Sequence, residues 1–173
     1  MRIAGLMLVC GLLGGCDREA ERWVPALSDE VIQKMKAQDP GLTDACLEKM
    51  RWGGFEAMPE ELDQCFRLTE PRRWKGVLHY DLEESRFCAD AVEQCPPPAN
   101  REGLTWLSFS SKVKLPEMLL TRPSDPLRRD FEIEFIGRRT LYPGHYGHMG
   151  TWPNEIMVDR LISVREVADT KEE

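Results

Sequence analysis

The chain lacks the short motifs that mark the commonest enzyme classes. It contains no G-x-S-x-G nucleophile motif, no P-loop, no G-x-G-x-x-G dinucleotide fingerprint and no H-E-x-x-H zinc motif. Histidine is scarce, with three residues, and no internal repeat is visible. Because no catalytic constellation is recognised, the sequence favours a protein that is not an enzyme and that carries neither a cofactor nor a metal.

An excess of positive charge is also missing. Thirty Asp and Glu residues outnumber 23 Lys and Arg residues, which gives a formal net charge of -7. Binding to a phosphate backbone needs clustered Lys and Arg, whereas the arginine pairs at 72–73, 128–129 and 138–139 adjoin acidic residues. Nucleic acid is therefore excluded as a main partner. The 173 residues, 42% of them hydrophobic, fit one globular domain with a real core.

No apolar run is long enough to cross a bilayer. The longest, residues 3–13, follows Arg2 and falls well short of the ~20 residues that a spanning helix needs. The composition turns polar at Asp17, directly after Cys16. A short positive region followed by a short apolar region is typical of a secretory signal, although the usual A-x-A cleavage site is absent.

The end of this apolar region, Leu13-Gly14-Gly15-Cys16, resembles the lipobox of bacterial lipoproteins, with Gly14 a less common small residue at its position. The resemblance implies a signal peptide at 1–15, lipidation of Cys16, and a lipidated tether at 16–27. Several acyl chains on one cysteine would hold a soluble domain at a lipid bilayer. Asp17 resembles an inner-membrane retention signal, so the inner membrane is slightly favoured and the outer membrane stays possible. The alternatives are a plain secretory peptide cut elsewhere and a short buried helix.

The remaining cysteines number four, an even count that predicts two disulfides in an exported chain. They are Cys46, Cys65, Cys88 and Cys95. Their spacing lacks the C-x₂₋₄-C of structural zinc sites and the C-x-x-C of redox sites. Of the three possible connectivities we favour the sequential one. A helix capped by Thr43 and a second helix starting at Pro59 would form a hairpin that places Cys46 opposite Cys65.

The hydrophobic pattern changes from helical to strand-like near residue 71. Ser28 is suited to cap a helix over residues 28–38. Four segments show strand patterns, with a slip near Asp159 that indicates a β-bulge: 75–82, 103–110, 130–137 and 154–167. Residues 114–126 indicate a short helix or an irregular crossover.

The predicted fold class is therefore α+β. An N-terminal helical hairpin segment (28–70) precedes a small, mostly antiparallel β-barrel, OB-like, or a curled sheet, in a β-rich core domain (71–167). A frayed tail follows at 168–173. The segments FIGRRTLYPGHYGHMG and EIMVDRLISV are similar to those of small uncharacterised exported proteins of Gram-negative bacteria, a resemblance that implies no activity.

The loop YPGHYGHMG and the tryptophan after it form the candidate contact surface. Its residues are Tyr142, His145, Tyr146, His148 and Trp152. The glycines alone would also be explained by a tight turn. We expect a membrane-anchored periplasmic lipoprotein that serves as a binding or assembly module, with another envelope protein as a possible partner. Two alternatives remain: a metal-dependent envelope hydrolase using His79, His145 and His148, and an inhibitor or immunity-type protein presenting the 142–152 loop.

Overall fold

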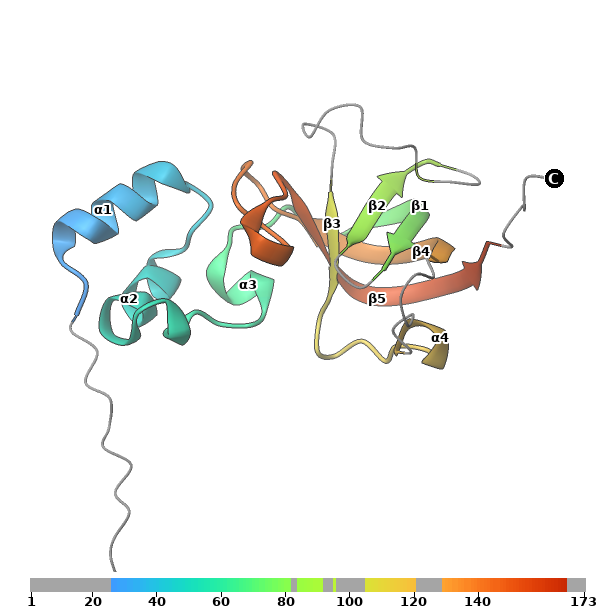
Figure 1. Ribbon diagram of the computed structural model, residues 1–173, viewed down its shortest axis with the longest axis horizontal. Coiled ribbons are helices and arrows are strands. Elements are labelled where there is room, and N and C mark those ends of the chain that lie inside the picture. Colours follow the sequence, from blue (N-terminus) through green and yellow to red (C-terminus); the bar gives the residue numbers. More distant parts are fainter. Residues whose placement is uncertain (1–25, 82–83, 92–94, 96–104, 121–128, 168–173) are drawn as a thin grey trace, which may run out of the picture.

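The computed structural model describes residues 26–81, 84–91, 95, 105–120 and 129–167. The predicted signal peptide, Cys16, Asp17, nearly all of the tether and the C-terminal tail lie outside the described residues. Helices come first and strands follow (Figure 1). Within the described residues, no helix combines the length and the apolar character needed to cross a bilayer.

Five strands close into a small barrel in the order β1-β2-β3-β5-β4, with β4 pairing back onto β1. They are β1 (Arg72–Tyr80), β2 (Ser85–Ala89), β3 (Trp106–Phe109), β4 (Arg129–Arg139) and β5 (Glu155–Glu166). Only β3 and β5 run parallel; the other neighbouring pairs are antiparallel. A short helix, α4 (Glu117–Leu120), lies between β3 and β4 in the chain. The chain is thus α+β with a small closed barrel, as the sequence predicts.

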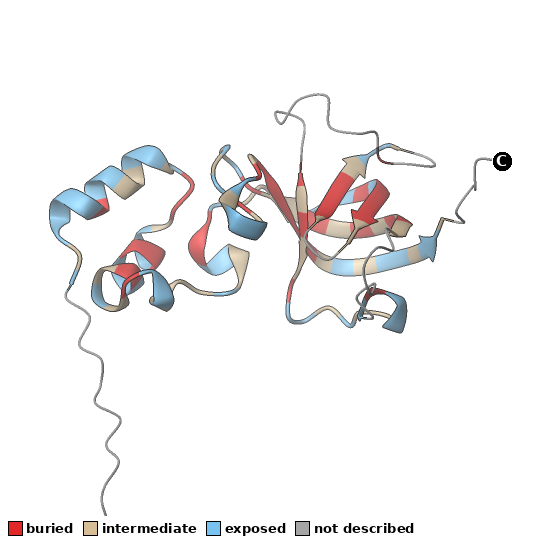
Figure 2. Ribbon diagram, viewed as in Figure 1, coloured by how far each residue is buried: buried red, intermediate tan, exposed pale blue. Residues whose placement is uncertain are grey.

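Alternating residues of the strands fill the barrel interior, and the buried residues are coloured red along the ribbon in Figure 2. Along β4, Phe131, Ile133 and Phe135 are buried in this core, while the residues between them are partly exposed. Leu119 of α4 packs against the same cluster. The predicted alternation of residues 130–137 is therefore confirmed, because one face of the strand is inside the barrel and the other is wet.

The predicted bulge in β5 is also confirmed. The pairing with β4 moves from Val158 opposite Gly137 to Arg160 opposite Ile136, so Asp159 has no partner residue across the ladder. A second shift leaves out Ile162 in the same way. Two such irregularities let a long strand bend around a small barrel.

The N-terminal segment contains α1 (Asp29–Gln38), α2 (Asp44–Gly53), the 3₁₀ turn η1 (Phe55–Ala57) and α3 (Leu62–Cys65). Ser28 and Thr43 cap α1 and α2 as predicted. The helix predicted from Pro59 is only the single turn α3. It ends there because the chain becomes extended at Phe66, which bridges to Leu42, and the Arg67 N–H donates to the Gly41 carbonyl.

Both cysteine pairs lie at disulfide distance in the sequential connectivity that the sequence favours. Cys46 pairs with Cys65 and Cys88 with Cys95, with Cα–Cα distances of 4.8 and 5.5 Å. The first pair is fully buried and joins α2 to α3. The second joins the end of β2 to Cys95, whose Sγ contacts the backbone of β1 and β2.

A second hydrophobic cluster lies outside the barrel, among α1, α2, α3 and the loop between β4 and β5. Its buried members are Ile32, Leu42, Cys46, Leu47, Met50, Cys65, Phe66, Tyr146 and Trp152. The ring of Tyr146 meets Phe66 edge-on at 5.0 Å between centroids, and Trp152 lies 5.5 Å from Trp106 of β3. The β4–β5 loop therefore fastens the helices to the barrel.

Candidate functional site

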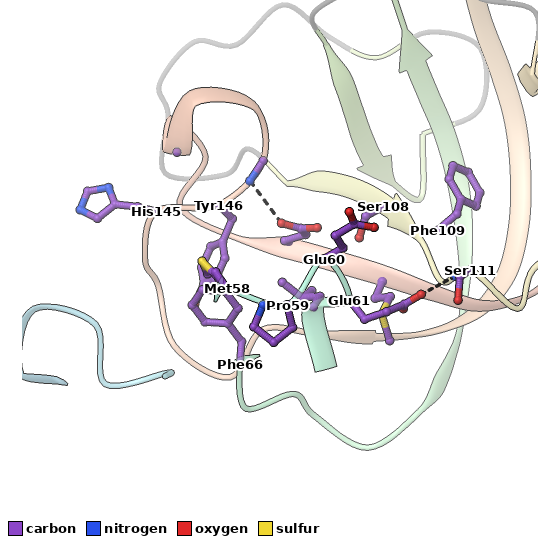
Figure 3. A pocket seen from close by; sticks show the side chains of 15 residues that line it. Met58, Pro59, Glu60, Glu61, Phe66, Ser108, Phe109, Ser111, His145 and Tyr146 are labelled. Atoms are coloured by element: carbon purple, nitrogen blue, oxygen red, sulfur yellow. Dashed lines mark hydrogen bonds between the residues drawn. The ribbon is translucent and has the colours of Figure 1, made fainter. Parts of the chain in front are cut away.

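A cavity of about 550 Å³ opens between the helical segment and the outer face of β3 and β5 (Figure 3). Its floor is formed by outward-facing residues of the two parallel strands, Ser108, Glu155 and Met157. One wall comes from residues 58–62 and Phe66, and the other from residues 145–147 and Gly150 of the β4–β5 loop. Three segments that are far apart in the sequence thus meet at one hollow.

Glu155 is the most deeply placed charge in this cavity, with 7% of its surface exposed. Burial raises the pKa of its carboxyl group above the ordinary value, while Ser108 and the Gly147 N–H oppose the shift. The Gly147 N–H donates to Glu155 Oε2 at 3.2 Å. Ser108 Oγ is buried near the same carboxyl without a hydrogen bond of normal geometry, so the Gly147 contact is the firmer of the two. A partly satisfied carboxyl in a cavity is a place where a ligand can gain a strong contact.

Gly147 is fixed in its position by local geometry. Its φ is +64°, a conformation that glycine adopts readily, and a Cβ there would lie 2.6 Å from the Trp106 ring. At the other end of the cavity, Glu61 accepts a hydrogen bond of 2.7 Å from the Ser111 N–H, drawn in Figure 3. The hydrogen bonds between Gly147 and Glu155 and between Glu61 and Ser111 hold the two walls of the cavity to the barrel.

The lining combines acidic and apolar side chains. Glu60, Glu61 and Glu155 supply three carboxyl groups, and the described lining includes no lysine and no arginine. The one basic side chain, His145, is exposed, and its imidazole points away from the cavity in Figure 3. Aromatic rings and thioethers from Phe66, Phe109, Tyr146, Met58 and Met157 cover the rest. The net charge of the side chains that line the cavity is therefore negative.

The five residues of the predicted contact surface do not share one environment. Tyr146 and Trp152 are buried in the second cluster, Tyr142 is half-buried, and His145 and His148 are exposed. Burial raises the pKa of Tyr146 to about 12, helped by the nearby Asp39 carboxylate. Tyr146 donates its hydroxyl to the Tyr142 carbonyl at 2.9 Å. Tyr146 and Trp152 thus pack the loop against the helices, and the Tyr146 ring also lines the cavity.

The three-histidine metal site is wrong. His79 lies opposite Asp130 at the start of β4, whereas His145 and His148 follow the end of that strand at Arg139. At ~3.3 Å per residue, nine residues of strand separate the two ends by about 30 Å. A metal ion bridges ligands only a few ångströms apart, so these imidazoles cannot share one.

His79 instead belongs to a different cluster at the β1–β2 turn. Its Nδ1 lies 2.6 Å from Asp130 Oδ1, and its Nε2 faces Glu84 Oε2 at 3.7 Å and Asp81 Oδ2 at 3.9 Å. One atom from each of His79, Asp81 and Glu84 lies within 4.8 Å of the others. Among the described residues, this is the one group of three or more His, Cys, Asp or Glu side chains that lie this close together.

Sequence reasoning missed the cavity residues Glu155, Ser108 and Glu60. One signal could have indicated the first, since Glu155 directly precedes the apolar run Ile156–Val158 at a strand start. A carboxyl at the edge of a buried strand needs a partner or a function. Comparison with protein-family models, with curated proteins and with solved structures found no match.

Proposed function

We propose that this protein is an exported lipoprotein, anchored through Cys16 and facing the periplasm, whose folded part is a binding module. The lipobox-like residues 13–16 support the anchor, and the two cysteine pairs support an oxidising compartment. Asp17 slightly favours the inner membrane. The binding role is carried by one observation, the acidic and apolar cavity of about 550 Å³.

We take the barrel to be an OB-fold, which supports this role. Its strand order, its parallel β3–β5 pair and the helix between β3 and β4 fit that five-stranded Greek-key design, which binds ligands on an outer strand face and its loops. We take the segment 28–70 to be a helical hairpin that caps the outer face of β3 and β5. In this protein the cap and the β4–β5 loop turn an open surface into a cavity.

The lining favours a ligand with an apolar body and a positively charged group. A cation would pair with Glu155 and Glu60, and its body would contact Phe66, Tyr146 and Met157. Charge-assisted hydrogen bonds are about twice as strong as neutral ones, and a deep carboxyl is poorly solvated until such a partner arrives. Because binding requires the charged carboxylate, affinity should fall as the pH drops and Glu155 becomes protonated.

The probe pair phenethylammonium and 3-phenylpropionate tests this assignment, since the two share an aromatic body and differ in charge. Phenethylammonium should raise the melting temperature of the full chain in detergent and 3-phenylpropionate should not. Glu155→Gln should abolish the response, while Glu117→Gln, on α4, should leave it unchanged. Equal responses to both probes would refute a cation site.

The point where the tether joins the domain supports a particular orientation of the domain at the membrane. The Leu27 N–H donates to the Arg51 carbonyl at 2.8 Å, so the tether meets the last turn of α2. Beside it, Trp52 and Phe55 expose 65% and 70% of their surface. Tryptophan is enriched at bilayer interfaces. We propose that this aromatic pair rests on the lipid headgroups, within the ~35 Å that a tether of about ten residues can span.

A further inference from the structure

Two polar side chains on the floor of the cavity lack the partners that buried polar groups usually have. Ser108 Oγ is buried and has no hydrogen-bond partner among the described residues. Glu155 Oε2 accepts from the Gly147 N–H, but no hydrogen bond of normal geometry reaches Oε1 from the described part of the chain. Both groups cost stability in this state, because a buried polar atom has lost its contacts with water. A ligand that bonds to both groups would remove this cost.

The register of the parallel strands makes these two side chains neighbours. Trp106 stands opposite Glu155, and Ser108 follows two residues along β3 on the same outer face. The Ser108 hydroxyl is close enough to the Glu155 carboxyl to oppose the rise of its pKa. Ser108 is partly exposed as a residue and lines the cavity (Figure 3), so a rotation about its χ1 brings the hydroxyl to the cavity surface. One group of a ligand can therefore reach both Ser108 Oγ and Glu155 Oε1.

The cavity offers a cation hydrogen-bond acceptors rather than open aromatic faces. Phe66 and Tyr146 are 8% and 3% exposed and meet edge-on, so packing covers most of each ring. A quaternary ammonium has no N–H group and is recognised through the open faces of several aromatic rings. Such a group would leave Ser108 Oγ and Glu155 Oε1 without a partner. The arrangement therefore favours a cation that carries N–H donors.

The contact between Gly147 and Glu155 separates an ammonium from a guanidinium. A guanidinium binds a carboxylate best through two parallel N–H bonds, one to each oxygen. At Glu155 the Gly147 N–H already bonds to Oε2, and Gly147 is packed against Trp106 and Trp152. A primary ammonium carries three N–H donors on one nitrogen. It needs only Oε1 of the carboxylate and has further donors for Ser108 Oγ.

We propose that the cationic group of the ligand is a primary ammonium that donates to Glu155 Oε1 and to Ser108 Oγ, and that Ser108 sets this preference. The assignment rests on the cation site of the proposed function and adds which cation that site takes. Two kinds of ligand share this chemistry: a small arylalkyl amine, and the amino terminus of a peptide whose first residue is aromatic. Both place an apolar body next to a primary ammonium.

Titration calorimetry of the full chain in detergent at pH 7 tests the proposal with three cations that share one aromatic body. They are phenethylammonium, its N,N,N-trimethyl derivative and phenethylguanidinium. The trimethyl derivative should bind about tenfold or more weakly than phenethylammonium, because it cannot donate to the charged carboxylate. Phenethylguanidinium should also bind less tightly than phenethylammonium. Either of these two cations binding as tightly as phenethylammonium would overturn the assignment and leave the cation site in place, whereas no binding of any of the three would refute the cation site and the assignment together.

Ser108→Ala separates a binding role of this residue from a structural one. The affinity for phenethylammonium should fall about three- to tenfold, and the affinity for the trimethyl derivative should not change. The melting temperature without ligand should stay the same or rise, because the buried hydroxyl has no partner to lose. Ser163→Ala, at an exposed position of β5 outside the cavity lining, is the matched control and should bind as the unaltered chain does. A Ser108→Ala variant that weakens all probes alike, or that binds phenethylammonium undiminished, would overturn the role of Ser108.

Phenylalaninamide distinguishes the two sources of the amine. It has the amino group and side chain of a peptide amino terminus and no carboxylate, and its affinity is compared with that of phenethylammonium per protonated amine. Tighter binding of phenylalaninamide would assign the site to a peptide amino terminus, and tighter binding of phenethylammonium would assign it to a small amine. Either result upholds the primary ammonium.

Discussion

Removing the disulfide between Cys46 and Cys65 should loosen the helical segment and leave the barrel folded. The two cysteines are 19 residues apart and link α2 to α3 inside the second hydrophobic cluster. That cluster shares no buried residue with the barrel core, which makes separate loosening physically reasonable. Alanine is the right replacement, because both side chains are fully buried and serine would bury a hydroxyl group.

The size of the effect follows from the loop that the bridge closes. For a loop of about 20 residues, the chain-entropy model gives roughly 3 kcal/mol at 25 °C. The bridge between Cys88 and Cys95 spans seven residues of sequence separation, for which the same model gives about 2.5 kcal/mol. The first pair should therefore cost slightly more free energy of unfolding than the second.

Urea unfolding followed by circular dichroism measures these differences, and hydrogen exchange locates them. In the double alanine variant of Cys46 and Cys65, amides of α2 and α3 should exchange faster, and those of β1 and β4 should keep their protection. Loss of protection throughout β4 would refute the idea that the two clusters loosen separately. A loss of less than about 1 kcal/mol would refute the loop-entropy reasoning.

Three further predictions concern the cavity and the membrane face. Glu155→Gln should stabilise the protein at neutral pH. Burial raises the pKa of the Glu155 carboxyl group in the folded state. The stability that this carboxyl group contributes is therefore fully present below its ordinary pKa of 4.5 and is lost as the pH rises through its folded-state pKa. Urea midpoints at pH 4 and pH 8 check this, and a variant no more stable at pH 8 would contradict it. Gly147→Ala should cost about 1–3 kcal/mol in thermal melts, because φ is +64° and the Trp106 ring leaves no room; an unchanged melting temperature would show that the loop adapts. In a Trp23→Phe background, which removes the tryptophan of the tether, brominated lipids should quench the fluorescence of the anchored protein, and Trp52→Phe should remove most of that quenching, whereas equal quenching with and without Trp52 would place this residue away from the bilayer.

Much of the fold could be predicted because its signals are local. The alternation of Phe131, Ile133 and Phe135 indicates a strand with one buried face, and the slip near Asp159 indicates the bulge that the structure contains. Ser28 and Thr43 mark helix starts through side chains that cap the next turn. Each of these inferences needs only a few neighbouring residues.

Strand β2 gave no such signal. Arg86 faces outward yet is buried, and Cys88 beside it is half-buried and bonded to Cys95, so the strand shows no contrast between its two faces. A strand covered on its outer side does not show the polar alternation that identifies a half-exposed one.

The candidate sites were harder to predict because they depend on distant parts of the chain. Glu61, Ser108 and Glu155 meet only after the barrel closes and the helices pack against it. A site formed by His79 and the histidines of the β4–β5 loop would need the strands to bring these residues to the same end of the barrel. The antiparallel register of β1 and β4 instead puts them at opposite ends of the two strands. Asp81 and Glu84 are close to His79 in the sequence, but the turn that aims them is visible only in the structure.

The central claim is the lipid anchor, and the mass of the N-terminal peptide tests it most directly. Protein extracted from membranes with detergent and digested with trypsin should yield a first peptide that starts at Cys16 and carries a thioether-linked diacylglyceryl group. Treatment with globomycin should keep residues 1–15 attached. A peptide that runs unmodified through Gly15 and Cys16 in untreated cells would contradict the account.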